Sequence, residues 1–335
     1  MNFNIDSWVK KAEHYGLEYK NVKFVIENNF AKVVAIDLSK DFLIKVNEPL
    51  LIPYNRLIIE EDFHKVKDVN NEFDNLISEY LDFIFSEEKI KYIANLNESL
   101  LKLNENLKHK LSSFGLNVLL LEKLSKKEIK KMLIHARLIR INNQFYFMPF
   151  MDMVNHSFEF GYNYSISKNS VSLTGKPRSK EIFAIYNTGD SFHFLTKYMF
   201  PEQSWFAYSN AVSFNINNKQ INIQRKFQQF EIKNGIRTPK IEINENEITF
   251  SFVLIGAKKA PRQPFWGFKK ACLQAGIIDS ITLFSVIKNE NIRLLVEILK
   301  EIDVIENPGV RDIIKTCALN QLEILGYSIC DNQVI

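Results

Sequence analysis

The sequence predicts an α+β protein, because the type of hydrophobic periodicity changes several times along its 335 residues. Residues 21–53 alternate β-branched and polar side chains, which predicts short antiparallel strands with turns at 28–29 and 40–41. From about residue 60 to residue 140, apolar residues recur at the three-to-four spacing of amphipathic helices. Strands return over residues 143–208, and this order of elements excludes a simple array of βαβ units.

Local signals support several of these elements. Ser125 is followed three residues later by Glu128, which is the pattern of a capping box at the start of a helix. Residues 240–255 alternate as in a β-hairpin that turns at Asn244–Asn246, and the tail from Phe265 has helical periodicity.

Two domains are expected from this organisation. Residues 1–215 would form a small β domain that is interrupted by a helical insertion at about residues 60–130. Residues 216–335 would form a mostly helical C-terminal domain.

Composition excludes several classes of function. Glycine is scarce, with 11 residues, and neither GxxxxGK[ST] nor GxGxxG occurs, so no glycine-rich phosphate loop is predicted. The net charge of +4 is too diffuse to predict nucleic-acid binding. Cys272, Cys317 and Cys330 are far apart, which fits a reducing compartment. Charge throughout the N-terminal segment and the lack of an apolar run of roughly 18 residues predict a soluble, cytoplasmic protein without a signal peptide.

One polar group stands inside an unusually aromatic run at residues 147–165. Asp152, Asn155 and His156 lie between aromatic residues on both sides. Polar groups in apolar surroundings cost free energy unless a partner satisfies them, and that partner can be the protein itself or a ligand. No metal site is predicted, because Asp152 and His156 lack a third ligand at a suitable spacing.

Two other segments have ordinary explanations. The basic stretch at residues 123–141 could contact nucleic acid, but a solvated helix face is the favoured explanation. The aromatic stretch at residues 191–208 is by itself typical of core packing. No GxSxG surrounds any serine, so a hydrolase nucleophile is not predicted.

An ordered pair of segments nevertheless matches a known pattern. The segment HARLIRINNQFYFMPFMDMVNHS (135–157), followed by SKEIFAIYNTGDSFHFLTKYMF (179–200), resembles SET-domain methyltransferases of the Rubisco large-subunit lysine methyltransferase type. The family pattern P-x-x-D-x-x-N-H-S falls on Pro149, Asp152, Asn155, His156 and Ser157. Its pattern E-[IV]-[FY]-x-x-Y falls on Glu181, Ile182, Phe183 and Tyr186.

The resemblance extends over nearly the whole chain. Residues 33–53 look like part of the first segment of the family, whose two glycines fall just before them, on Phe30 and Lys32. The Ser of the Ser-Arg pair falls on Ala136, and Met199 replaces Gly in the YGF motif. The resemblance implies a SET-like β domain with a pseudoknot, an inserted helical region and a mostly helical substrate-binding domain.

The resemblance also implies a site for S-adenosylmethionine and a protein substrate. Tyr186 would be the catalytic tyrosine, with its hydroxyl beside the transferring methyl group. The cofactor would be bound by Asn29, Phe30, Ala31, Arg137, Asn155, His156, Tyr198 and Phe200. The protein substrate would meet Arg137, Asp152, Tyr164, Tyr186 and Tyr198, and Phe158 would add an aromatic wall.

Two functions follow as hypotheses. The first is an S-adenosylmethionine-dependent protein methyltransferase, with lysine as the acceptor and histidine as the alternative. The second is a SET-like protein-binding module that has lost strong cofactor binding, since Phe30 and Lys32 stand where glycine permits close approach of the backbone to the cofactor. In either case we expect a monomer that binds a partner protein. We expect no metal, no membrane association and no nucleic-acid partner.

Overall fold

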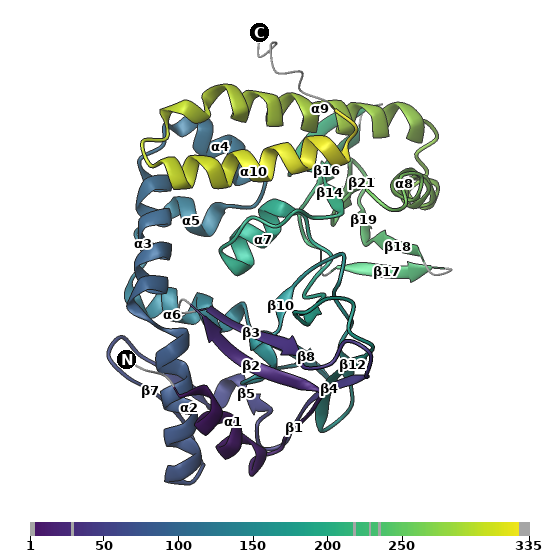
Figure 1. The fold of residues 1–335 in the computed structure, drawn as a ribbon. Coiled ribbons are helices and arrows are strands. Elements are labelled where there is room, and N and C mark those ends of the chain that lie inside the picture. The colour runs from purple at the N-terminus through teal and green to yellow at the C-terminus, as the bar shows by residue number, and fades with distance from the viewer. Residues whose placement is uncertain (1–3, 28–29, 217–218, 228, 234–235, 328–335) are drawn as a thin grey trace. The chain divides into compact units, whose positions relative to one another are not determined.

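The computed structural model shows two compact units (Figure 1). It describes residues 4–27, 30–216, 219–227, 229–233 and 236–327. One unit consists of Met1–Ile93 with Ser125–Asn187, and the other of Ala94–Leu124 with Thr188–Ile335. The α+β class predicted from the sequence is confirmed. The boundary expected at residue 215 falls inside the second unit, because α7 (Ser191–Tyr198) packs against α10 (Pro308–Ile324).

The first unit is built mainly from short strands. They are β1 (Leu17–Lys20), β2 (Val22–Glu27), β3 (Phe30–Ala35), β4 (Phe42–Asn47), β5 (Ile52–Pro53), β6 (Leu57–Ile59), β7 (His64–Val66), β8 (Leu138–Ile141), β9 (Gln144–Phe147), β10 (Asn155–His156), β11 (Ser165–Ile166), β12 (Ser170–Gly175) and β13 (Phe183–Ala184). The order β1-β4-β12-β11 forms an antiparallel sheet, and β2 pairs with β3 as an antiparallel hairpin. Alternate residues of β4 and β12 are buried, as Ile44 and Leu173 show, so this sheet supplies the core.

The helices of the first unit follow the expected order with one correction. They are α1 (Ile5–Glu13), α2 (Asn71–Ile84), the start of α3 (Glu87–Leu101) and α6 (Lys126–His135), with the short 3₁₀ turns η1 (Tyr54–Arg56) and η2 (Met151–Met153). The capping box at Ser125 and Glu128 is present at the start of α6. The expectation that helix begins near residue 60 is wrong, because β6 and β7 form a hairpin there in which Glu60 N donates to Phe63 O at 2.9 Å.

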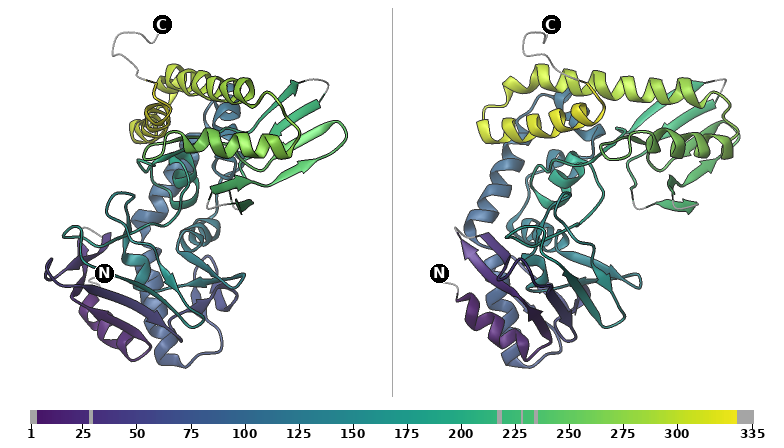
Figure 2. Two further views of the ribbon diagram at one scale, coloured as in Figure 1. Left: turned by 90° about the vertical axis from the view of Figure 1, so that its right-hand side faces the viewer. Right: turned by 45° about the vertical axis from the view of Figure 1, so that its right-hand side comes forward.

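The second unit combines helices with a mixed sheet. Its helices are the rest of α3, α4 (Glu105–Ser113), α5 (Asn117–Leu121), α7, α8 (Gln263–Gln274), α9 (Ser280–Glu301), η3 (Ile302–Val304) and α10. Its strands are β14 (Phe206–Tyr208), β15 (Val212–Ile216), β16 (Lys219–Ile223), β17 (Phe230–Lys233), β18 (Ile236–Pro239), β19 (Ile241–Ile243), β20 (Glu247–Phe250) and β21 (Leu254–Ala257). The long helices α9 and α10 lie side by side (Figure 2).

Two sequence-based expectations for the second unit can be compared with these elements. The hairpin around Asn244–Asn246 is confirmed, since β19 and β20 pair antiparallel with Ile243 opposite Ile248. The helical tail is also confirmed, and its first helix, α8, begins at Gln263, after the last strand ends at Ala257. Within the described parts of the chain, no helix has the length and apolar character needed to cross a membrane.

Candidate functional site

Two very short parallel strands hold the centre of the candidate site. In β10 and β13, Asn155 lies opposite Phe183 and His156 opposite Ala184. The pairing continues beyond them, where Ser157 N donates to Ala184 O at 3.2 Å. The pairing places Asn155 and His156 against the segment that leads to Tyr186, and both segments belong to the first unit. The threaded, knot-like connection stays a prediction.

His156 is buried and fixed by the backbone of Tyr186. Tyr186 N donates to His156 Nδ1 at 3.0 Å, so the proton of the neutral imidazole is on Nε2. The His156 ring contacts the rings of Phe158 and Tyr186 at centroid distances of 4.6 and 5.2 Å. Burial lowers the pKa of His156 to about 4. This side chain therefore stays neutral and serves to hold the Tyr186 segment in place.

The lowered pKa of His156 predicts a pH-dependent loss of stability. In the unfolded chain this group titrates near 6.5, so between about pH 6.5 and pH 4 the unfolded state binds the proton and the folded state does not. The free energy of unfolding should fall as pH decreases through that window, by up to about 1.4 kcal/mol per pH unit. An NMR titration of the folded protein should show no titration of the His156 ring above about pH 5. A midpoint for that ring near 6.5 would contradict the assignment.

Asn155 joins three segments that are far apart in the sequence. Its Nδ2 donates to Ala31 O at 3.2 Å and to Glu181 Oε1 at 2.7 Å. The backbone supports the same arrangement, since Ile182 N donates to Val33 O at 2.8 Å. The Asn155 side chain is exposed, so a ligand can reach it. The structure thus places Ala31 and Asn155 together, as the motif resemblance implies.

The Tyr186 hydroxyl has a defined orientation. It donates to Val154 O at 2.5 Å, and the residue is only half-buried. Val154 directly precedes Asn155, so this bond joins Tyr186, the last residue of one motif, to the interior of the other motif. The hydroxyl of Tyr186 is therefore hydrogen-bonded to the same stretch of backbone that carries Asn155 and His156.

Asp152 is the centre of a buried polar cluster. Its side chain is 4% exposed, Arg137 Nε lies 3.2 Å from its Oδ2, and the Tyr80 hydroxyl donates to its Oδ1. Burial raises the pKa of Asp152, and the Arg137 guanidinium opposes that shift. Tyr80 also accepts from Phe150 N at 3.2 Å. The structure brings Arg137 and Asp152 together, but the protein itself satisfies the Asp152 carboxylate.

Lys89 adds a second cation to this cluster. Its Nζ donates to Phe83 O at 3.0 Å and lies 3.9 Å from the centre of the Phe83 ring. Burial, reinforced by the Arg137 charge, lowers the pKa of Lys89 to about 8. Sequence analysis missed Lys89 and Tyr80, because both lie within ordinary amphipathic helices. Only their approach to Asp152 in three dimensions distinguishes them.

Gly161 allows the aromatic segment to fold closely around β13. A Cβ at this position would lie 2.2 Å from Ser157 O and 2.9 Å from the Ala184 carbonyl carbon. The neighbouring Tyr162 N donates to Phe183 O at 3.0 Å, which fixes the segment against the strand. The close approach therefore requires glycine at residue 161.

Gly161→Ala should shift the β10–β13 pair, because both of the closest atoms belong to the backbone and cannot rotate away. The expected loss in the free energy of unfolding is on the order of 1–3 kcal/mol. Urea denaturation measures this loss of stability, and Gly276→Ala is the control. An added Cβ at Gly276 meets nothing within 4 Å, so the stability lost in that variant arises only from the φ of +70°. Hydrogen exchange at Ser157 and Tyr162 should rise only in Gly161→Ala. Unchanged exchange at these amides would contradict the close-packing argument.

The remaining predicted site residues are not brought into this cluster by the described contacts. Asn29 lies outside the described residues. Phe30, the first residue of β3, is 71% exposed. Tyr164 is half-buried in the first unit. Tyr198 and Phe200 belong to the second unit, where their ring centroids are 6.1 Å apart.

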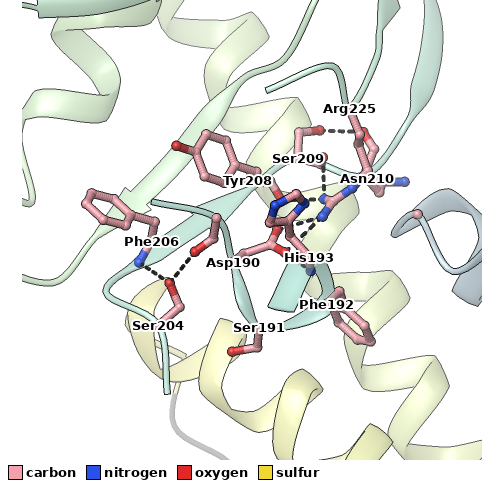
Figure 3. A network of polar contacts seen from close by, with 12 residues as sticks. Asp190, Ser191, Phe192, His193, Ser204, Phe206, Tyr208, Ser209, Asn210 and Arg225 are labelled. Carbon is pink, nitrogen blue, oxygen red and sulfur yellow. Dashed lines mark hydrogen bonds and ion pairs between the residues drawn. The ribbon is translucent and has the colours of Figure 1, made fainter. Parts of the chain in front are cut away.

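The helix that ends at Tyr198 is anchored by a buried ion pair in the second unit (Figure 3). Asp190 is fully buried, accepts from His193 N at 2.9 Å as the N-cap of α7, and accepts two bonds from Arg225 Nη2 at 2.9 and 2.8 Å. At the other end, Met199 adopts φ of +64°. That left-handed conformation is the one that favours glycine, so methionine is strained at this position.

No family model matches the chain. An uncharacterized protein of Aquifex aeolicus (strain VF5) is 27% identical over 97 residues, which cover 29% of this chain and 80% of that protein.

Three solved structures are similar to this chain, each at 12% identity. One is the SET domain of LSMT bound to lysine and AdoHcy, with 96% of this chain and 89% of that chain covered and a TM-score of 0.41. Another is Rubisco LSMT bound to AdoMet, with 97% and 90% covered and a TM-score of 0.45. The third is Rubisco LSMT bound to sinefungin and monomethyllysine, with 96% and 89% covered and a TM-score of 0.43.

Proposed function

We propose that this chain is an S-adenosylmethionine-dependent methyltransferase that acts on a lysine side chain of a protein. The observation that carries the proposal is the convergence of three distant segments in the first unit. Ala31, Asn155 with His156, and the stretch from Glu181 to Tyr186 meet through the hydrogen bonds of Asn155 and His156. These are the segments to which the sequence motifs assign the cofactor and the catalytic tyrosine.

The chemistry of these groups fits the amino-acid end of S-adenosylmethionine. An ammonium group needs hydrogen-bond acceptors, and Ala31 O, the Glu181 carboxylate and the exposed Asn155 amide provide them in one place. Asn155 would hold the amino-acid part of the cofactor, and the His156 backbone would meet the adenine. The bound cofactor supplies an electrophilic methyl group on a sulfonium ion.

The chain's own residues would position and desolvate the acceptor. A lysine amine attacks only when it has lost its proton, and apolar surroundings favour the neutral form. Phe158 is buried beside His156, and the half-buried Tyr186 hydroxyl is held toward Val154 O by its hydrogen bond. We propose that this hydroxyl orients the amine during transfer. Positioning of this kind supplies much of the rate in an in-line displacement.

A second function is favoured by one observation at β3. Phe30 occupies a position of the family's glycines and is 71% exposed, and Lys32 in the other position bonds Glu27 Oε2 at 2.5 Å. Side chains at these two positions prevent the close approach of backbone to cofactor that glycine permits, which suits a protein-binding module that no longer binds the cofactor tightly. Isothermal titration calorimetry with S-adenosylmethionine separates the two functions, since only the methyltransferase should bind it.

Asn155→Ala should weaken binding of S-adenosylmethionine by about ten- to a hundredfold, because a hydrogen bond to a charged group is lost. Thermal stability should fall only slightly, because both hydrogen bonds of the Asn155 amide, to Ala31 O and Glu181 Oε1, are exposed, and a typical hydrogen bond contributes about 1 kcal/mol. The matched control is Asn106→Ala, which removes another exposed amide that donates to a carboxylate, Glu301 Oε1 at 3.0 Å. Calorimetry on wild type and both variants provides the measurement. A lower melting temperature with unchanged affinity for Asn155→Ala would assign this residue a structural role instead.

A further inference from the structure

The second unit contains an apolar cavity that the proposed catalytic site does not use. Its volume is about 230 Å³, and it lies between β14, the segment leading into β21, and α8. The walls are largely aromatic, with Phe206, Tyr208, Phe252 and Phe268 among the lining side chains. The rings of Phe206, Tyr208 and Phe252 belong to one packed group that also contains Phe227 and Leu254. The walls are therefore preformed by the core of the unit.

The size of the cavity limits what can fill it. Pockets for small molecules are usually about 300–1,000 Å³, so a space of about 230 Å³ is smaller than a typical cofactor or drug site. Apolar rings line most of it, and Gln263 and Thr188 are the main polar contributors. One large apolar side chain from a peptide fits both the volume and the chemistry.

One segment of the cavity wall is basic, although one of its lysines is paired, since Lys258 Nζ lies 2.9 Å from Glu323 Oε1. Residues 251–278, which supply much of its wall, contain five lysine and arginine residues and no aspartate or glutamate. Lys259 and Arg262 are exposed, and neither is paired with a carboxylate in the described part of the chain. Both lie beside the walls: Lys259 Nζ is 3.6 Å from the ring centre of Trp205, which precedes Phe206, and Arg262 precedes Gln263.

We propose that this cavity docks an acidic segment of a partner protein, which inserts one large apolar side chain between β14 and α8. The carboxylates of the segment would meet Lys259 and Arg262, because unpaired exposed cations attract and orient an acidic partner. The buried apolar side chain would supply most of the affinity. This inference goes beyond the proposed function, because docking at the cavity needs neither the cofactor nor an acceptor lysine.

Binding of defined peptides tests the docking site without cofactor or an acceptor lysine, so its outcome is independent of the proposed chemistry. The probe is a rhodamine-labelled peptide Glu-Asp-Glu-Phe-Glu-Asp-Glu, and its anisotropy is measured with the full chain. Replacing Phe by Ala in the peptide should weaken binding by about ten- to a hundredfold. Replacing the acidic residues by Gln and Asn should weaken it by about tenfold and remove its dependence on salt.

Variants of the protein complete the experiment. Gly267→Leu adds a side chain to the lining face of α8, where leucine is a better helix former than glycine, and should abolish the preference for Phe over Ala in the peptide. Lys259→Glu with Arg262→Glu changes only exposed positions and should weaken binding by at least about tenfold. The charge-matched control is Lys126→Glu with Lys131→Glu on the exposed side of α6, which should bind as wild type does.

Several results would overturn the proposal. They are equal binding of the Phe and Ala peptides, an equal loss of affinity in the control variant, and no binding at about millimolar peptide. Equal competition by a single-stranded oligonucleotide of the same charge would also overturn it, because a polyanion would then bind the cations without using the cavity. Failure of the docking test with intact S-adenosylmethionine binding would leave the proposed function standing.

Discussion

Tyr186→Phe should fold normally, bind S-adenosylmethionine as wild type does and lose about 10²–10³ in methyl-transfer rate. The substitution keeps the ring and its contact with His156 but removes the hydroxyl that donates to Val154 O. Loss of one hydrogen bond to a backbone carbonyl costs about 1 kcal/mol of stability, so the fold should persist. The larger effect should be on turnover, because orientation of the acceptor matters more in the transition state than in the ground state.

A matched tyrosine provides the control for this experiment. Tyr162→Phe also removes a hydroxyl that donates to a backbone carbonyl, that of Lys176, and no catalytic role is proposed for it. Turnover and Michaelis constant are measured for wild type and both variants on a protein that wild type methylates. The loss should appear in turnover rather than in the Michaelis constant, and only in Tyr186→Phe. Equal turnover for Tyr186→Phe and wild type would refute the assignment and direct attention to Tyr164 or Tyr198.

Asp190→Ala should lower the free energy of unfolding of the second unit by about 3–5 kcal/mol. The substitution leaves the Arg225 guanidinium, whose side chain is 8% exposed, without the carboxylate that accepts its two bonds. It also removes the N-cap of α7, where Asp190 accepts from His193 N. Loss of a cap alone typically costs about 1 kcal/mol, so the unpaired buried charge dominates the effect.

Hydrogen exchange of the full chain locates this loss. Amides of α7 and the strands beside Arg225 should exchange faster in Asp190→Ala, while amides of the first unit should not change. The control Asp303→Ala removes an 88% exposed carboxylate that lies 3.9 Å from Arg311, and it should change stability by less than about 0.5 kcal/mol. Adding Arg225→Met to Asp190→Ala should recover part of the stability, because no charge is then left buried. No recovery would show that the cap, rather than the ion pair, carries the effect.

The parts of the fold that the sequence predicted correctly depend on neighbours along the chain. The capping box of Ser125 and Glu128, the hairpin at Asn244–Asn246 and the helical tail all have signals within a few residues. The error near residue 60 has the same origin. The apolar spacing there is compatible with a helix, and only pairing between β6 and β7 selects the strand.

The sequence by itself determined the α+β class and the candidate residues Asn155, His156 and Tyr186, because periodicity and motif order are local properties of the chain. Only the tertiary structure decided which backbone and side-chain groups form hydrogen bonds with these three residues. The strands β10 and β13 have two residues each, so no local propensity specifies their pairing, and contacts between distant segments must supply its stability. The same reason hid Tyr80 and Lys89, which become recognisable only where folding buries Asp152 beside them.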